Sequence, residues 1–262
     1  MSSIPIWKVV FLGALQGATE FFPVSSSAHL VIFQQYLGLG REGSFLMAFD
    51  VALHFGTLLA VAAVFWRDLI WIFQKGEGRR LGLLLIVATV PAAAVGILFK
   101  GFFETLFADV IPAGFFLMVT GLILWLTQKA PAPAIQFSNM KQKQAWLVGL
   151  AQAAAILPGL SRSGATIAAG LFVKMHPQVA VRFSFLMAVP AILGASLVEA
   201  HKFAALQFSI LLPVLLGTIT AFAVGYISIR WMLKIVAGKK LYQFAWYCWG
   251  VGGIVLVKEL FF

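Results

Sequence analysis

The chain has 262 residues, of which 61% are hydrophobic and only 11% are charged, and its formal net charge is +10. A soluble domain keeps about 25% charged residues to cover its surface, so we expect an all-α polytopic membrane protein instead. The basic excess is then explained by Lys and Arg in cytoplasmic loops, and a nucleic-acid partner is excluded. The single cysteine, Cys248, excludes an internal disulfide and a cysteine-based metal site.

The first informative stretch combines an amide, a carboxylate, hydroxyls and an imidazole in an otherwise apolar segment. Gln16 and Glu20 are four positions apart, so on a helix they share one face. Pro23 is expected to end that helix, because its ring removes a backbone donor and clashes with the preceding turn. Ionisable groups at membrane depth cost about 2.5–3.5 kcal/mol each on insertion scales. Such groups are usually kept for function.

A second helix is expected after Pro23, capped by Ser25 or Ser26. On its first turn Ser26 and His29 would face the same way, three positions apart. The bent pair would present hydroxyls, free backbone N–H groups and a positive helix end at its corner. Such a corner suits an oxyanion such as phosphate.

Six apolar segments are predicted to cross the membrane, each approaching the ~20 residues that a span needs. They are residues 44–66, 81–99, 113–127, 180–200, 208–230 and 242–260. In the first of them Asp50 and His54 share a helix face. We interpret these two residues as ties between helices, with lining of a polar pocket as the alternative. Residues 67–80 and 100–112 are predicted to be charged connections, and 128–144 a linker.

The second half repeats the plan of the first. The stretch from Gly149 to Pro158 resembles the stretch from Gly13 to Pro23, and a second broken helix pair is expected to turn over residues 158–166. The chain is thus predicted to be two repeats, 1–128 and 142–262, in a single integrated membrane domain. If both broken pairs are re-entrant, each repeat has an odd number of spans. The repeats are then inverted in topology.

The basic residues indicate an orientation. Most of the 19 Lys and Arg fall in 67–80, 129–143, 174–182 and 230–240, and the positive-inside rule places these loops in the cytoplasm. Lys8, Arg41, Lys100, Lys202 and Lys258 would then lie outside, with both termini. Two broken helices that enter from opposite faces bring their corners together near the midplane.

The predicted pocket holds the groups that phosphoryl transfer needs. Glu20 and Arg162 are expected charge partners. Glu20, assisted by Gln16, offers oxygen ligands to a hard divalent cation, and Arg162 offers a guanidinium to phosphate oxygens. Ser26 is a candidate nucleophile, with Glu20 or His29 as its base. Substrate binding is expected from the hydroxyls and backbone N–H groups of the two turns: Ser25, Ser27, Ser161, Ser163, Gly164 and Thr166.

Four motifs, QxxxE, PVSSSAH, FDVALHFGT and PGLSRSGAT, closely resemble the undecaprenyl-diphosphate phosphatases, also called bacitracin-resistance proteins. The resemblance runs nearly end to end. It implies a multi-pass enzyme of the bacterial inner membrane that removes the terminal phosphate of undecaprenyl diphosphate and recycles the lipid carrier for peptidoglycan synthesis. It also implies a divalent cation, Mg²⁺ or Ca²⁺, and a pocket that opens toward the periplasm.

On that resemblance the family's acidic motif falls on Gln16 and Glu20, its serine–histidine motif on Ser26 and His29, and its arginine motif on Ser161, Arg162, Ser163 and Thr166. Many members have a glutamate where this chain has Gln16.

Three questions are left open by the sequence. Ser26 is the favoured nucleophile, through a phosphoseryl intermediate, with His29 or a metal-bound water as alternatives. A transporter or flippase of polyprenyl phosphates is the competing function, because inverted repeats with broken midplane helices are also a transporter architecture. A homodimer is compatible with the sequence.

Overall fold

The computed structural model describes residues 5–39, 44–198, 211–237 and 240–262. Within these ranges the regular structure is helical, apart from one isolated β-bridge between Ile135 and Met175. The α-helices are α1 Ile6–Phe21, α2 Ser26–Tyr36, α3 Ser44–Val64, α4 Trp66–Trp71, α5 Glu77–Leu98, α6 Lys100–Phe107, α7 Val110–Leu126, α8 Gln142–Ala154, α9 Arg162–Phe172, α10 Pro177–Val198, α12 Leu211–Ala237 and α13 Phe244–Phe261. Short 3₁₀ helices are η1 Thr127–Lys129, η2 Phe137–Asn139 and η4 Leu241–Gln243.

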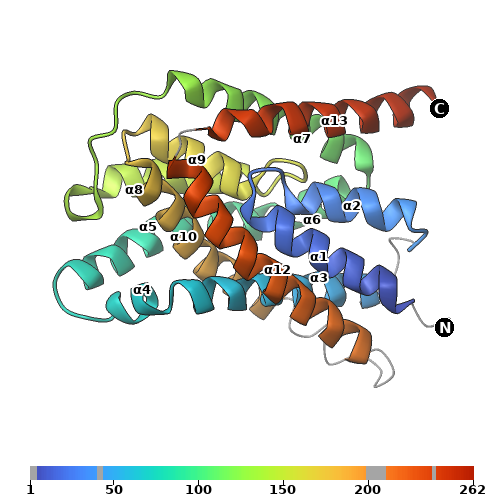
Figure 1. Cartoon of the computed structure of the whole chain (residues 1–262), viewed down its shortest axis with the longest axis horizontal. Helices are drawn as coiled ribbons and strands as arrows, with labels where there is room; N and C mark the ends of the chain where they lie inside the picture. The colour runs from blue at the N-terminus through green and yellow to red at the C-terminus, as the bar shows by residue number, and fades with distance from the viewer. Residues whose placement is uncertain (1–4, 40–43, 199–210, 238–239) are drawn as a thin grey trace.

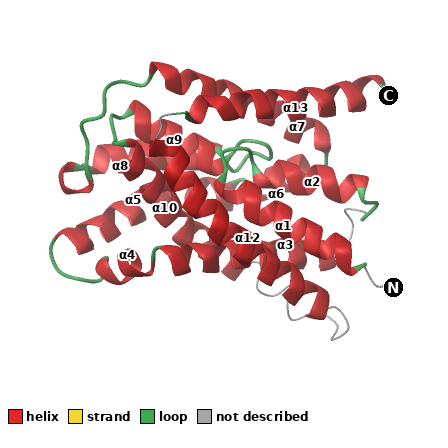
Figure 2. Ribbon diagram, viewed as in Figure 1, coloured by secondary structure: helices red, strands yellow, loops and turns green. Residues whose placement is uncertain are grey.

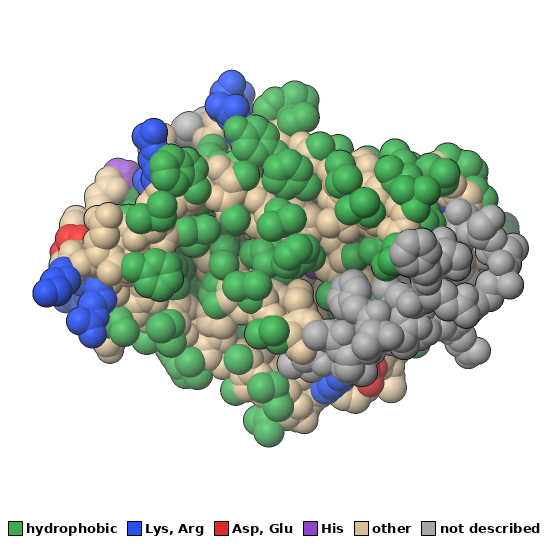
Figure 3. Space-filling view, turned by 90° about the horizontal axis from the view of Figure 1, so that it is seen from below, with side chains coloured by type: hydrophobic (Ala, Val, Ile, Leu, Met, Phe, Trp, Pro, Cys, Tyr) green, Lys and Arg blue, Asp and Glu red, His purple; other side chains and the backbone are tan. Residues whose placement is uncertain are grey.

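Most of the helices run along the long axis of the molecule (Figures 1 and 2). Both termini lie at one end, and the connections from α4 to α5 and from α7 to α8 lie at the other (Figure 1). Figure 3 shows hydrophobic side chains over the middle of one face and Lys and Arg side chains gathered at the end away from the termini. This distribution is that of a molecule whose middle faces lipid and whose ends face water.

Five described helices are long and apolar enough to cross a membrane, and a shorter apolar helix covers 48–64. The five are Glu77–Leu98, Val110–Lys129, Pro177–Leu197, Leu211–Val236 and Leu241–Phe261. The chain is therefore a multi-pass membrane protein. The predicted span ends at 199–200 and 208–210, and the predicted positions of Arg41, Lys202 and Lys239, lie outside the described residues.

Two predicted connections are wrong in detail. Residues 67–80 contain α4 and the first turn of α5, and 100–112 contain α6 and the start of α7. Most of the charges there lie on these helices, and the turns between the helices are set by individual residues. Gly76, with φ at 84°, provides the left-handed turn before α5. The carboxylate of Asp109 caps α7 by accepting from the N–H of Ile111 at 3.1 Å.

Helices of the first half pack closely on helices of the second half. A Cβ on Gly13 would lie 2.5 Å from the carbonyl oxygen of Gly217 in α12, so α1 approaches α12 backbone to backbone. A Cβ on Gly149 of α8 would lie 2.4 Å from the carbonyl oxygen of Ala88 in α5. Small residues allow this approach, which is a common way to pack membrane helices. The first and second halves of the chain therefore pack helix against helix in at least two places.

Candidate functional site

The first turn lies between α1 and α2. The Ser25 hydroxyl caps α2 by accepting from the N–H of Ala28 at 3.4 Å. Ser25 itself has φ at 66°, a left-handed conformation that costs a non-glycine residue about 1–3 kcal/mol and is typical of functional sites. The turn thus holds Ser26 at the first position of α2 by means of a strained neighbour.

The second turn lies between α8 and α9 and is fixed from α7. The Ser161 hydroxyl caps α9 by accepting from the N–H of Gly164 at 3.1 Å. Thr120 of α7 donates its hydroxyl to the carbonyl oxygen of Gly159 at 2.8 Å and accepts from the N–H of Ser161 at 2.9 Å. Thr120 was not predicted, because a lone threonine in an apolar span carries no distinguishing sequence signal.

The two turns are in direct contact. The Ser163 hydroxyl donates to the carbonyl oxygen of Phe22 at 3.2 Å. The N–H of Gly159 lies 3.5 Å from the hydroxyl oxygen of Ser27. The contact brings the two sets of polar residues, more than a hundred positions apart in the chain, into one buried cluster.

Glu20 is the centre of this cluster and is 7% exposed. Its Oε1 accepts from the Arg162 guanidinium at 2.8 Å, and its Oε2 accepts from the Ser26 hydroxyl at 2.6 Å. The Gln16 amide donates to the same Oε2 at 3.1 Å. A carboxylate thus lies between the serine and the arginine and bonds to both. The expected pairing of Glu20 with Arg162 is present.

His29 is buried but faces a different partner. Its Nδ1 lies 2.8 Å from the carbonyl oxygen of Ser25, which can only accept, so Nδ1 carries the proton. Its Nε2 then accepts from the Tyr247 hydroxyl at 2.8 Å, and the two rings are stacked at 5.7 Å with 11° between their planes. Both ring nitrogens are occupied, so the described contacts give His29 no hydrogen bond to Ser26.

Tyr247 was missed by the sequence reasoning. It lies on α13, 218 positions from His29, and the sequence offers no motif around it. Its only signal is that it is one of just 4 tyrosines in the chain.

Asp50 and His54 have separate surroundings. Asp50 accepts from the Gln34 amide at 2.6 Å and so ties α3 to α2. The Nε2 of His54 lies 3.8 Å from Oε2 of Glu20, which puts this imidazole at the edge of the cluster. Asp50 therefore ties two helices together, whereas His54 lies beside the carboxylate of the cluster.

The remaining predicted binding residues lie at the turns, but their hydroxyls already have protein partners. Ser25 and Ser27 share a hydrogen bond at 3.1 Å, and Ser161 and Ser163 share one at 3.2 Å. An oxyanion that binds here would have to replace these hydrogen bonds between hydroxyls with hydrogen bonds to its own oxygens.

Thr166 is held further along α9. Its hydroxyl donates to the carbonyl oxygen of Arg162 at 2.7 Å and lies 2.6 Å from the Ser184 hydroxyl of α10. The Arg162 guanidinium also donates to the carbonyl oxygen of Ser184, at 3.3 Å. These contacts fix the side of α9 that carries the guanidinium.

The cluster offers oxygen atoms to a cation. Within the described residues no group of three or more His, Cys, Asp and Glu is placed to hold a metal ion. The Oε1 of Gln16 is nevertheless buried without a hydrogen-bond partner, and a carboxylate lies next to it. One amide oxygen and one carboxylate fit Mg²⁺, which usually keeps several waters and takes its other ligands from substrate phosphates.

Comparisons with known proteins agree with these features. A family model described as "Bacitracin resistance protein BacA" matches residues 9–254. "Undecaprenyl-diphosphatase" of Halothermothrix orenii is 43% identical over 96% of this chain and 97% of its own length. The protein of the same name in Methanobrevibacter smithii is 42% identical over 97% and 98%. "Undecaprenyl-diphosphatase 4" of Bacillus thuringiensis is 40% identical over 97% of each chain.

Proposed function

The chain belongs to the bacitracin resistance protein BacA family, and on this premise we propose that it hydrolyses undecaprenyl diphosphate to undecaprenyl phosphate and inorganic phosphate. The names of its relatives give the substrate. The observation that carries the proposal is the continuous contact from the Ser26 hydroxyl to Glu20 and from Glu20 to Arg162. A hydroxyl, a base and a fixed cation are the parts that phosphoryl transfer needs.

In the first step the Ser26 oxygen attacks the terminal phosphorus. The carboxylate of Glu20 takes the hydroxyl proton along the 2.6 Å hydrogen bond. A bond forms between the serine oxygen and phosphorus, and the bond from phosphorus to the bridging oxygen breaks. The electron pair leaves with undecaprenyl phosphate, and the enzyme carries a phosphoserine.

In the second step water attacks the phosphoserine. The protonated Glu20 returns its proton to the serine oxygen as the phosphorus–oxygen bond breaks, and the attacking water loses its own proton to solvent. Inorganic phosphate leaves, and Ser26 is restored. Glu20 is preferred to His29 as the base because Tyr247 and the Ser25 carbonyl occupy both imidazole nitrogens.

Arg162 and the N-terminus of α9 would receive the phosphate oxygens. The guanidinium is held by Glu20 and by the Ser184 carbonyl, so it is oriented before substrate arrives. A divalent cation, for which we propose Mg²⁺ or Ca²⁺, would neutralise further phosphate charge when held by Gln16 and Glu20. His54 would lie beside this carboxylate as a second polar group.

Tyr247 would act through His29. The Ser25 carbonyl fixes the proton on Nδ1 of His29, and the Tyr247 hydroxyl donates to Nε2 and holds the orientation of the ring. Since His29 bonds to the carbonyl of Ser25, this contact supports the strained turn that presents Ser26. Tyr247 is thus a positioning residue for the nucleophile.

The helix lengths support one arrangement in the membrane. Helices α1, α2, α8 and α9 have 16, 11, 13 and 11 residues, so at about 1.5 Å per residue each is shorter than the roughly 30 Å hydrocarbon core. We propose that α1–α2 and α8–α9 are re-entrant pairs whose turns meet near the midplane. With α3, α5 and α7 in one repeat and α10, α12 and α13 in the other, the chain would cross six times.

This assignment makes 1–128 and 142–262 inverted repeats. It pairs α1 with α8 and α5 with α12, and the close contacts of α1 with α12 and of α8 with α5 are then equivalent. We propose that the end bearing the basic loops faces the cytoplasm of a bacterial inner membrane, and that the site opens toward the periplasm.

The purified full-length chain in detergent tests the function. With undecaprenyl diphosphate and Mg²⁺ it should release inorganic phosphate, and chelation of the cation should stop the release. If no phosphate is released but the chain moves polyprenyl phosphates across a reconstituted bilayer, it is a transporter and the hydrolytic assignment is wrong.

A further inference from the structure

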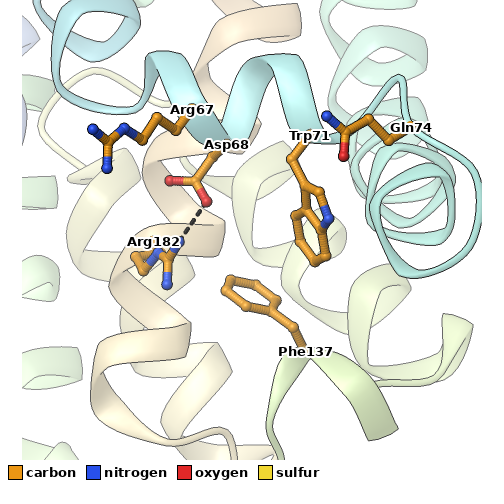
Figure 4. A pocket seen from close by; sticks show the side chains of 6 residues that line it. All are labelled: Arg67, Asp68, Trp71, Gln74, Phe137 and Arg182. Atoms are coloured by element: carbon orange, nitrogen blue, oxygen red, sulfur yellow. Dashed lines mark hydrogen bonds and ion pairs between the residues drawn. The ribbon is translucent and has the colours of Figure 1, made fainter.

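A cavity of about 470 Å³ lies at the end of the molecule away from the termini and shares no lining residue with the Glu20 cluster. It lies between α4, η2 and α10, and its lining residues are Arg67, Asp68, Trp71, Gln74, Phe137 and Arg182. Figure 4 shows Asp68 and Trp71 pointing from α4 toward Arg182 and Phe137, with Arg67 extending to the side. Cationic and aromatic side chains therefore surround one open space.

Arg182 is a pre-oriented cation in this cavity. Its guanidinium donates to the Asp68 carboxylate and lies 5.4 Å from the centre of the Phe137 ring. Its side chain is still 42% exposed, and a guanidinium has five N–H donors, more than the pair with Asp68 uses. Phe137 is held in turn by Arg80, which donates to the carbonyl oxygens of Phe137 and Met140.

A second cation stands at the rim. The Arg67 guanidinium lies 5.3 Å from the centre of the Trp66 ring and is exposed. Two guanidiniums and one carboxylate leave the lining with a net charge of one positive. This charge complements the single negative charge of a phosphate diester. The Trp71 indole and the Gln74 amide add neutral donors for the polar part of a ligand.

The outer side of this region is apolar. Trp66, Ile70 and Phe73 are 53%, 54% and 85% exposed. Trp66 and Ile70 are four positions apart on α4 and share a helix face, and Phe73 lies in the turn that follows this helix. Exposed aromatic residues beside Lys and Arg are typical of the membrane–water interface. Acyl chains can therefore lie against this face while a phosphate group reaches the cavity.

From these features we propose that the cavity binds the headgroup of an anionic phospholipid, at the end of the molecule opposite the termini. Arg67 and Arg182 hold the phosphate diester, and Trp66, Ile70 and Phe73 contact the chains. The site goes beyond the proposed hydrolysis and does not depend on it.

Native mass spectrometry of the full chain in neutral detergent tests this site, with phosphatidylglycerol and phosphatidylcholine as probes. The wild-type protein should retain phosphatidylglycerol in preference to phosphatidylcholine. Arg67→Gln should lower that retention about fivefold, since one basic residue near a membrane surface is worth roughly 1 kcal/mol. The matched control is Arg230→Gln, because Arg230 is also exposed and lies 5.5 Å from the ring centre of Tyr226. This control should retain the lipid as the wild type does.

Three outcomes would overturn the proposal. Equal losses in Arg67→Gln and Arg230→Gln would show diffuse attraction rather than a site, and equal retention of both lipids would show no charge recognition. Displacement of the lipid by glycerol phosphate at the same concentration would identify a site for soluble phosphates. Phe73→Ser provides a second variant, and it should weaken the retention of phosphatidylglycerol while leaving its preference over phosphatidylcholine.

Discussion

Replacing Glu20 by glutamine separates its proposed role as a base from its role as a hydrogen-bond acceptor. The amide oxygen of Glu20→Gln can still accept from Arg162 or from Ser26, but it cannot take the serine proton. Loss of a positioned general base typically costs 10²–10⁴-fold, so we expect kcat to fall by about that factor.

The same change removes the counter-ion of a largely buried guanidinium. The side chains of Glu20 and Arg162 are 6% and 17% exposed, and breaking a buried pair from one side costs about 3–5 kcal/mol. Glu20→Gln should therefore also unfold at a lower temperature. Activity must be measured per folded molecule, after size-exclusion chromatography and below the midpoint of unfolding.

Phosphate release under single-turnover conditions provides the assay. Glu104→Gln is the matched control, because Glu104 is exposed and lies 3.9 Å from Lys100 on α6, away from the cluster. It should retain wild-type rates and stability. If folded Glu20→Gln released phosphate within about threefold of the wild type, Glu20 would not be the base and the proton route proposed above would be wrong.

Three further changes test other parts of the site. Tyr247→Phe keeps the ring against His29 but removes one hydrogen bond worth about 1 kcal/mol, so kcat should fall about fivefold with KM unchanged. Gly159→Ala should destabilise the fold by more than about 2 kcal/mol in chemical denaturation, because φ is +100° and the new Cβ would lie 2.2 Å from the carbonyl oxygen of Ala113. Gln16→Leu removes the unpartnered amide oxygen and should raise the Mg²⁺ concentration for half-maximal activity about tenfold or more.

Each of these changes has a control in the same chain. Tyr226→Phe should leave kcat unaltered, and Gly250→Ala should leave stability unaltered, because a Cβ at Gly250 would meet nothing within 4 Å. Gln128→Leu should leave the Mg²⁺ requirement unaltered. A rise in KM alone for Tyr247→Phe would indicate substrate contact rather than positioning. An unchanged Mg²⁺ requirement in Gln16→Leu would remove Gln16 from the metal site.

Much of the cluster was predictable because its residues lie in two repeated motifs. Helix periodicity places Gln16 beside Glu20, and the prolines and serines of each turn predict where the helices break. The repeat then suggests that the turns meet, which is the arrangement that brings Arg162 to Glu20.

The parts that were not predicted depend on tertiary contacts without a local pattern. Tyr247 is one aromatic residue in a chain that also has 25 Phe and 8 Trp, and nothing near it in sequence points to His29. The sequence left Glu20 and His29 open as the base for Ser26, and it gave no sign that Tyr247 is the partner of His29. Likewise, the charges of 67–80 suggested a loop, although Trp66 and Ile70 follow helical spacing and lie on α4. Charge content alone does not show how a short interfacial segment folds.

The most direct test of the account is phosphate release by Ser26→Ala, with Ser138→Ala as the control serine away from the cluster. If Ser26 attacks phosphorus, Ser26→Ala should lose about 10³-fold or more of the activity while remaining folded. Ser138→Ala should stay close to the wild type, because Ser138 is exposed in η2 and lies outside the cluster. Retention of most of the phosphate release by folded Ser26→Ala would contradict the serine mechanism and leave His29 or water as the nucleophile.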